Sequence, residues 1–193
     1  MSSTAVRYLI LPGWQGSPAE HWQSHWQEVL PNCTRVEQQD WLNPDPAKWV
    51  QALDKAITAA PTPVILVAHS LGCITVARWA KQASSAALCQ VKGALLVAPA
   101  DVERALCPAE IACFAPIPTD PLPFASLIVG SDTDKAASAA RVIQWSRQWQ
   151  APAVVLANAG HINVQSGHTR WEQGFAYLYR LQRHVDWALR RLA

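Results

Sequence analysis

Hydrophobic residues fall into two alternating patterns along the chain. Short apolar runs bounded by proline, glycine or polar residues are typical of buried strands, and they predict strands at residues 6–11, 33–38, 64–68, 91–98, 126–130 and 153–156. Between these runs, apolar residues recur at helical spacing, which predicts helices at residues 19–30, 47–60, 71–83, 135–150 and 171–192. Strands that alternate with helices form a mainly parallel sheet with helices on both faces. The pattern therefore predicts an α/β fold of about six strands in a single domain over residues 1–193.

Two segments need separate treatment. Residues 99–123 contain six prolines, each of which fixes φ and lacks a backbone N–H, so we expect a stiff, irregular connection with at most one short helix, near Val102. The last predicted helix has an apolar stripe and several arginines elsewhere on its surface. Packing of that stripe on the sheet, with the arginines in solvent, is favoured over contact with a membrane.

The third predicted strand leads into a helix through the tight sequence Ala68-His69-Ser70-Leu71-Gly72. A serine at such a junction, with a small residue on each side, is typical of the nucleophile elbow G-x-S-x-G. Alanine stands in place of the first glycine here, which is a mild departure because alanine is also small. A serine at this position also has the common alternative role of capping the helix. Ser70 is therefore a candidate nucleophile that needs support from the rest of the chain.

That support comes from the order of the remaining polar residues. A serine hydroxyl needs a base to take its proton, and a carboxylate usually orients that base. Hydrolases with this elbow present the three groups in the order serine, acid, histidine. His161 follows Gly160 after the sixth strand and is the predicted base. The predicted acid is Asp134, with Asp132 and Asp101 left as alternatives.

The first predicted strand ends in a loop, Pro12-Gly13-Trp14-Gln15-Gly16, that is rich in turn residues. Its glycine spacing matches neither G-x-G-x-x-G nor a P-loop, so no nucleotide is predicted to bind. A backbone N–H from this loop, at Trp14, is expected to stabilise an oxyanion together with the N–H of Leu71. Three aromatic residues are candidates for the substrate-binding pocket wall, although each could equally belong to the core: Trp14, Trp41 and Phe114.

Composition limits the possible partners. Of the 193 residues, 50% are hydrophobic and 16% are charged, with a formal net charge of +2, which gives no sign of nucleic-acid binding. No apolar run approaches the roughly 18 residues of a membrane span, and no signal-peptide pattern is present. Five cysteines, an odd number without C-x-x-C, fit reduced and mostly buried thiols in a cytoplasmic protein. The oligomeric state cannot be read from the sequence.

Metal binding is not predicted either. His21 and His25 have the i, i+4 spacing of two ligands on one helix face. The glutamate that follows the first histidine in zinc proteases is replaced by Trp22. These histidines are therefore interpreted as a surface or core-edge pair, and no metal or cofactor is expected.

Several short motifs together resemble a known family, the small bacterial α/β-hydrolases related to retinoblastoma-binding protein 9. The motifs are P-G-W-Q (12–15), H-W-Q-S-H-W (21–26), A-H-S-L-G-C (68–73), A-P-A-D-V (98–102), F-A-P-I-P (114–118), G-S-D-T-D (130–134) and G-H-I-N (160–163). The resemblance implies a compact α/β-hydrolase fold without a large lid, with nucleophile Ser70, acid Asp134 and base His161. The family often has proline after the acid, where this chain has Lys135.

The predicted function is that of a serine hydrolase, esterase-like, which cleaves small-molecule acyl esters through an acyl-enzyme intermediate. A peptidase or amidase with the same triad is one alternative. A non-catalytic binding protein that retains the fold is another, although the motif L-x-C-x-E is absent and residues 106–110 have the wrong spacing for it. Intact serine, histidine and aspartate favour chemistry over binding alone.

Overall fold

A computed structural model describes the backbone of residues 6–191 and the side chains of residues 6–185. Its centre is a sheet of six parallel strands in the order β2-β1-β3-β4-β5-β6. The strands are β1 Arg7–Leu11, β2 Cys33–Arg35, β3 Val64–His69, β4 Val91–Val97, β5 Ala125–Ser131 and β6 Ala153–Leu156. The helices are α1 Trp22–Val29, α2 Pro46–Thr58, α3 Leu71–Gln82, α4 Ser85–Gln90, α5 Ala109–Ala112, α6 Ala139–Gln148 and α7 Gly174–Arg191, with a short 3₁₀ turn, η1, at Val164–Ser166. The predicted α/β class and single compact sheet are confirmed.

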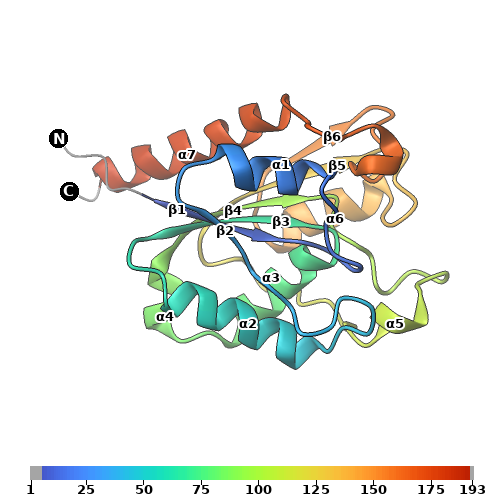
Figure 1. Cartoon of the computed structure of the whole chain (residues 1–193), viewed down its shortest axis with the longest axis horizontal. Coiled ribbons are helices and arrows are strands. Elements are labelled where there is room, and N and C mark those ends of the chain that lie inside the picture. The colour runs from blue at the N-terminus through green and yellow to red at the C-terminus, as the bar shows by residue number, and fades with distance from the viewer. Residues whose placement is uncertain (1–5, 192–193) are drawn as a thin grey trace.

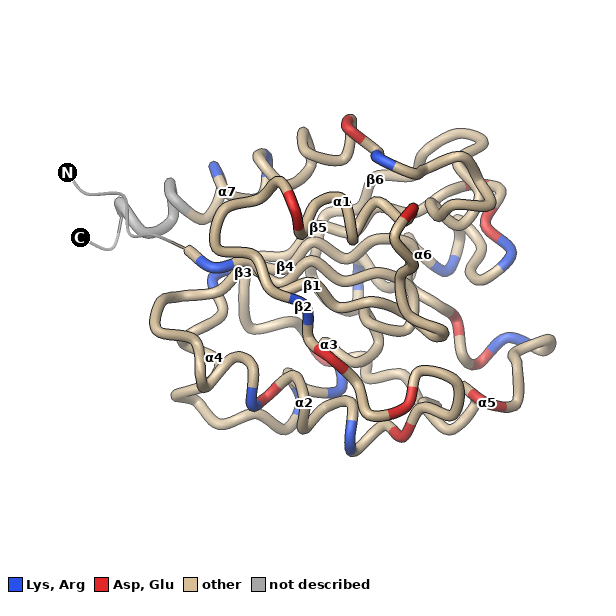
Figure 2. Tube along the Cα trace, in the orientation of Figure 1, with Lys and Arg blue, Asp and Glu red and all other residues tan. Residues whose placement is uncertain are grey.

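Helices cover both faces of the sheet (Figure 1). One face packs against α2, α3 and α6, and the other against α1 and α7. Successive residues of β3 alternate between these two cores, with Leu66 facing the first and Val67 the second. Because both faces are buried, the central strands read as continuous apolar runs rather than as an alternating pattern. Charged residues of both signs lie mostly on the surrounding helices and loops (Figure 2).

Several local expectations need correction. The short helix expected near Val102 is α5, which begins seven residues later, while residues 102–103 form a turn. In this turn the Asp101 carboxylate accepts a hydrogen bond from the Glu103 N–H at 3.1 Å. Helix α4 was not expected. Its first turn is capped by Ser84, whose hydroxyl accepts from the Ala87 N–H at 3.2 Å.

The exposure of the cysteines differs from the expectation, and the helices can be checked for their ability to span a membrane. All five cysteines are free thiols, but only Cys73 is fully buried and both Cys89 and Cys113 are exposed. The expectation of mostly buried thiols is therefore wrong. Within residues 6–191, no helix has the length and apolarity needed to cross a membrane.

The loop after β1 lies directly against the start of α3. A Cβ placed on Gly72 would lie 2.5 Å from the Leu11 carbonyl oxygen and 2.8 Å from that of Pro12. A Cβ on Gly13 would lie 2.7 Å from the Ser70 Cβ. All three distances are shorter than real Cβ atoms tolerate, so glycine is required on each side of the contact. The two glycines hold the loop after β1 beside Ser70.

This contact predicts a large effect of Gly72→Ala. The added methyl meets backbone atoms that cannot rotate away, so the free energy of unfolding should fall by about 2–3 kcal/mol. Gly167→Ala serves as a control. Gly167 has a positive φ of 82° but no atom near its would-be Cβ, so only backbone strain of about 1 kcal/mol is expected. Urea unfolding of both variants measures the difference, and an equal or smaller loss for Gly72→Ala would contradict the close packing.

Candidate active site

Ser70 occupies a strained turn between β3 and α3. Its φ of 54° and ψ of −120° are unusual for a residue other than glycine, and such strain clusters at functional sites. The turn is held by backbone hydrogen bonds, from the Ser70 N–H to the Val97 carbonyl at 3.0 Å and from the Ala100 N–H to the Ser70 carbonyl at 3.4 Å. The Ser70 side chain makes no capping hydrogen bond to α3. Helix capping therefore does not account for the serine.

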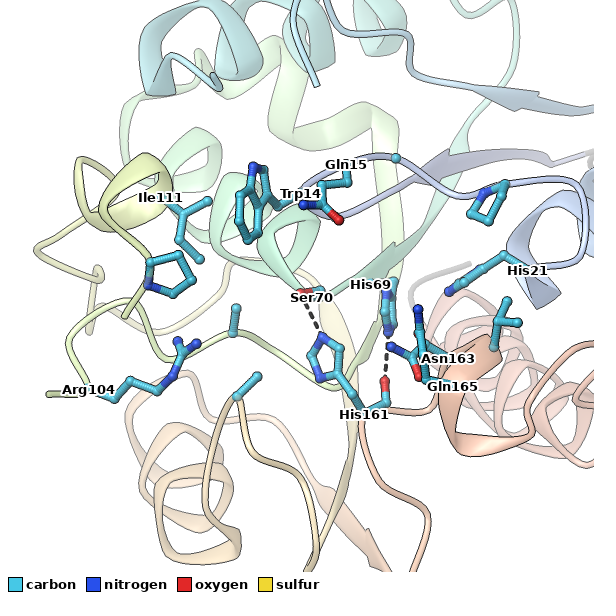
Figure 3. A pocket seen from close by; sticks show the side chains of 17 residues that line it. Trp14, Gln15, His21, His69, Ser70, Arg104, Ile111, His161, Asn163 and Gln165 are labelled. Carbon is cyan, nitrogen blue, oxygen red and sulfur yellow. Dashed lines mark hydrogen bonds between the residues drawn. The ribbon is translucent and has the colours of Figure 1, made fainter. Parts of the chain in front are cut away.

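The structure brings Ser70, His161 and Asp134 into one hydrogen-bonded chain. The Ser70 Oγ lies 2.9 Å from His161 Nε2 (Figure 3), and His161 Nδ1 lies 2.8 Å and 3.0 Å from the two Asp134 carboxylate oxygens. The Asp134 side chain is only 2% exposed, whereas that of His161 is 23% exposed. The carboxylate is thus shielded behind the imidazole, while the imidazole edge beside Ser70 reaches the cleft.

The three aspartates considered from the sequence have different surroundings. Asp134 also accepts a hydrogen bond from the Ala136 N–H at 2.7 Å, while the cap of α6 is provided by Ser138. Asp132 accepts from the Asn158 N–H at 2.8 Å. Asp101 lies 3.3 Å from Arg141 Nε in an ion pair. Among the three, only Asp134 contacts His161.

The loop that carries His161 is fastened to the end of β5. The N–H groups of residues 158, 159 and 160 donate in turn to the side chains of Asp132, Ser131 and Thr133, at 2.8, 3.0 and 3.1 Å. Three consecutive hydrogen bonds between the two loops fix their separation. They therefore set the distance between His161 and Asp134, which come from the two different loops.

Two further histidines, His21 and His69, line the cleft, and sequence reasoning gave neither a role there. The His69 Nε2 donates to the His161 carbonyl at 2.9 Å. The His21 ring lies 4.9 Å from that of His69, and the His21 Nδ1 caps α1 by accepting from the Gln23 N–H. The signal available in the sequence was position: His69 adjoins the serine.

Both rings are buried in the neutral form. Burial lowers the pKa of His69 well below its ordinary value. Burial, followed by the nearby positive charge of Arg35, lowers the pKa of His21 to about 4. Of the predicted surface or core-edge pair, His21 is therefore a core residue, and only His25 is partly exposed. Within the described residues, no cluster of histidine, cysteine and acidic side chains is arranged to hold a metal ion.

A cleft of about 470 Å³ opens over Ser70. Trp14 lines it, as predicted, and its indole N–H donates to the Leu42 carbonyl at 2.9 Å. Phe114 does not line it, because it is fully buried and packs edge-to-face on Trp49, so its predicted place in the pocket wall is wrong. Trp41 packs behind the loop, against Gly16, and is not part of the cleft lining either.

Two backbone N–H groups flank the serine. Leu71 is the first residue of α3, so its N–H has no partner within the helix. Trp14 follows Gly13, which lies against the Ser70 side chain. Neither N–H has a hydrogen-bond partner in the described part of the chain. Both are therefore free to donate a hydrogen bond to an oxyanion.

Comparison with solved structures defines the class as α/β hydrolase. The protein has a TM-score of 0.81 and 30% identity with a putative YdeN-like hydrolase from Pectobacterium atrosepticum, covering 93% of this chain and 92% of that one. The YdeN gene product of Bacillus subtilis has a TM-score of 0.74 and 17% identity over 93% of this chain and 100% of that one. Esterase 2 from Thermogutta terrifontis, phosphorylated by paraoxon, has a TM-score of 0.62 and 14% identity over 88% of this chain and 78% of that one.

Family assignment rests on the sequence itself. The pattern of the serine hydrolase family matches residues 8–180, which include the elbow, Asp134 and His161. A search of curated proteins finds no match. The chain belongs to the serine hydrolase family.

The buried His21 predicts a loss of stability in acid. Its pKa of about 4 in the folded protein lies below the value near 6.5 of an unfolded chain, so between these values the unfolded state binds more protons. Its contribution is fully present above pH 6.5 and is lost as the pH falls to 4, by about 3 kcal/mol. The free energy of unfolding is measured with urea between pH 7.5 and 4.5. We expect it to depend less steeply on pH in His21→Asn than in the native protein.

Asparagine keeps a side-chain oxygen that can cap α1, so His21→Asn removes the titration without removing the cap. His25→Asn, on the same helix, is the matched control and should keep the native pH dependence. If the free energy of unfolding of His21→Asn changed with pH as steeply as that of the native protein, the loss of stability in acid would arise from other residues.

Proposed function

We propose that this protein is a serine esterase that cleaves small acyl esters through a triad of Ser70, His161 and Asp134. The observation that carries the proposal is the continuous hydrogen-bonded chain from the serine hydroxyl through the imidazole to the buried carboxylate. A neutral serine is a weak nucleophile, and this arrangement is one that activates it. The three residues come from loops after β3, β5 and β6, where parallel α/β sheets gather their chemistry.

In the first half of the reaction, the Ser70 oxygen attacks the ester carbonyl carbon while His161 Nε2 takes the hydroxyl proton. The Asp134 carboxylate holds the other ring nitrogen protonated and stabilises the imidazolium that forms. Negative charge develops on the carbonyl oxygen and is stabilised by the N–H groups of Leu71 and Trp14. The tetrahedral intermediate then collapses as its carbon–oxygen bond to the leaving group breaks. His161 gives its proton to the departing alkoxide, which leaves as an alcohol, and the acyl group remains on Ser70 as an acyl-enzyme.

The second half repeats these roles with water. His161 takes a proton from a water molecule as its oxygen attacks the acyl carbon. The tetrahedral intermediate collapses, Ser70 recovers its proton from His161, and the carboxylic acid leaves. No group outside the chain is required for either half.

The cleft and the relatives support esters of modest size. A volume of about 470 Å³ suits a small ligand. The segment between β4 and β5 carries only the four-residue α5, so the site has no large lid over it. Two esterases share the fold: the one from Thermogutta described above and Est1E from Butyrivibrio proteoclasticus, whose structure holds ferulic acid. Comparing an aryl acetate with the matching acetanilide separates an esterase from an amidase.

Capture by a fluorophosphonate probe tests the nucleophile and the base without a known substrate. The probe phosphorylates an activated serine, so native protein should be labelled. Ser70→Ala should not be labelled at all, and His161→Ala should react at least about 10³-fold more slowly. Circular dichroism confirms that each variant is folded. Folded native protein that takes no label would refute the proposal and leave binding without catalysis as the better reading.

Replacing each candidate acid tests the third member of the triad. Asp134→Asn should lower kcat about 10³- to 10⁴-fold, because the amide favours the wrong imidazole tautomer. Asp132→Asn is the matched control: the same chemical change two residues away, with an oxygen that still accepts from the Asn158 N–H. It should keep kcat close to the native value. Equal losses in the two variants would point to a structural role for the loop rather than to Asp134 as the acid.

A further inference from the structure

One side chain in the cleft has a charge that the proposed reaction does not use. Arg104 lines the cleft, and the cleft lining contains no aspartate, glutamate or lysine. In Figure 3, Arg104 and Ile111 lie on one side of the Ser70–His161 pair, with His21 and Asn163 on the other. The Asp134 carboxylate lies behind His161 and is engaged with it. A single positive charge therefore faces one arm of the cleft.

A backbone contact holds this guanidinium in the lining of the cleft that contains Ser70. Arg104 is half-buried, and its Nη1 donates to the Asp101 carbonyl at 2.8 Å. Asp101 is next to Ala100, whose N–H bonds to the Ser70 carbonyl, and Ala100 itself lines the cleft. This one hydrogen bond uses one of the five N–H donors of the arginine side chain. The others are available to a ligand.

The acidic residues of the same segment are committed elsewhere. Both Asp101 and Glu103 form ion pairs with Arg141 of α6. Glu103 also accepts from the Ile117 N–H at 3.0 Å, and Asp101 accepts from the Glu103 N–H. Within the described residues, Arg104 has no carboxylate partner. Arg141 thus engages both carboxylates, and neither of them pairs with Arg104, whose side chain lines the cleft.

From these contacts we propose that Arg104 is a specificity-determining residue that selects ester substrates bearing a carboxylate at one end. A planar guanidinium binds a carboxylate with two parallel N–H···O bonds, which would place the ester carbonyl over Ser70 while the charged end rests on Arg104. The inference rests on the proposed esterase function and names its substrate class. It requires no new step, because Arg104 binds the remote end and takes no part in proton transfer.

The competing role for Arg104 is purely structural, since its bond to the Asp101 carbonyl also closes a turn. The two roles differ in what they affect. A turn-closing residue influences all substrates alike, whereas a carboxylate-binding residue influences only charged ones. A measurement on pairs of substrates that differ only in charge separates the two.

Two pairs of esters place the charge on either side of the scissile bond. In the first pair, 3-acetoxybenzoate and 3-acetoxybenzamide, the charge is on the leaving group. In the second, monoethyl adipate and the same ester with a terminal amide, the charge is on the acyl group. The quantity measured is the ratio of kcat/KM for carboxylate over amide.

Native protein should prefer the carboxylate by about ten-fold or more in at least one pair, as expected for a charge-assisted hydrogen bond, and 0.5 M salt should reduce the preference. Arg104→Gln should bring that ratio close to one while kcat/KM for the amide stays within about two-fold. Arg104→Lys should retain part of the preference. Arg147→Gln, which removes an exposed charge from α6 outside the cleft lining, should keep the native ratio.

The outcomes that overturn the inference are distinct from failure of the proposed function. A native ratio near or below one in both pairs, or a ratio that survives in Arg104→Gln, refutes the role of Arg104 while esterase activity stands. Equal losses on charged and neutral esters in Arg104→Gln assign the residue to the turn alone. Absence of both ester turnover and probe labelling in folded protein refutes the proposed function, and the inference falls with it.

Discussion

The close contact between the loop after β1 and the start of α3 is the constraint on which the site depends. Ser70 can present its hydroxyl only from a strained backbone, with φ at 54°, and such a conformation persists only where the surroundings enforce it. The enforcement is steric, because Gly72 lies against the Leu11 and Pro12 carbonyls and Gly13 lies against the Ser70 side chain. The same approach that holds the serine also places the Trp14 N–H beside it. The proposed nucleophile and the proposed oxyanion donors are therefore positioned by one packing arrangement.

A second set of contacts brings the base to the serine. His161 and Asp134 come from loops after neighbouring strands, and hydrogen bonds between those loops set their separation. Behind His161, the neutral His69 holds its carbonyl, and His21 packs on His69. Because these two rings are buried, protonation of either is unfavourable in the folded state. The hydrogen bond that holds the His161 loop and the predicted loss of stability in acid thus involve the same buried histidines.

The segment before β5 places one charged side chain, Arg104, in the lining of the cleft. Arg141 of α6 forms ion pairs with both Asp101 and Glu103, and Arg104 has no carboxylate partner among the described residues. The irregular segment before β5 therefore contributes a positive charge to the cleft instead of a covering lid. An open site of this kind excludes water poorly, so selectivity must come from contacts with the substrate itself. An arginine with free donors is suited to supply such contacts.

The amino-acid sequence by itself determined the α/β class, the six strands and the order of Ser70, an acid and His161, because hydrophobic period and turn residues are local properties. Only the tertiary structure decided between Asp134 and the two other aspartates, moved Phe114 from the expected pocket wall into the core, and exposed the unpaired charge of Arg104. Each of those outcomes depends on which side chain meets which partner across dozens of intervening residues. Such pairings follow from how loops at one edge of the sheet pack together, and no local pattern records them.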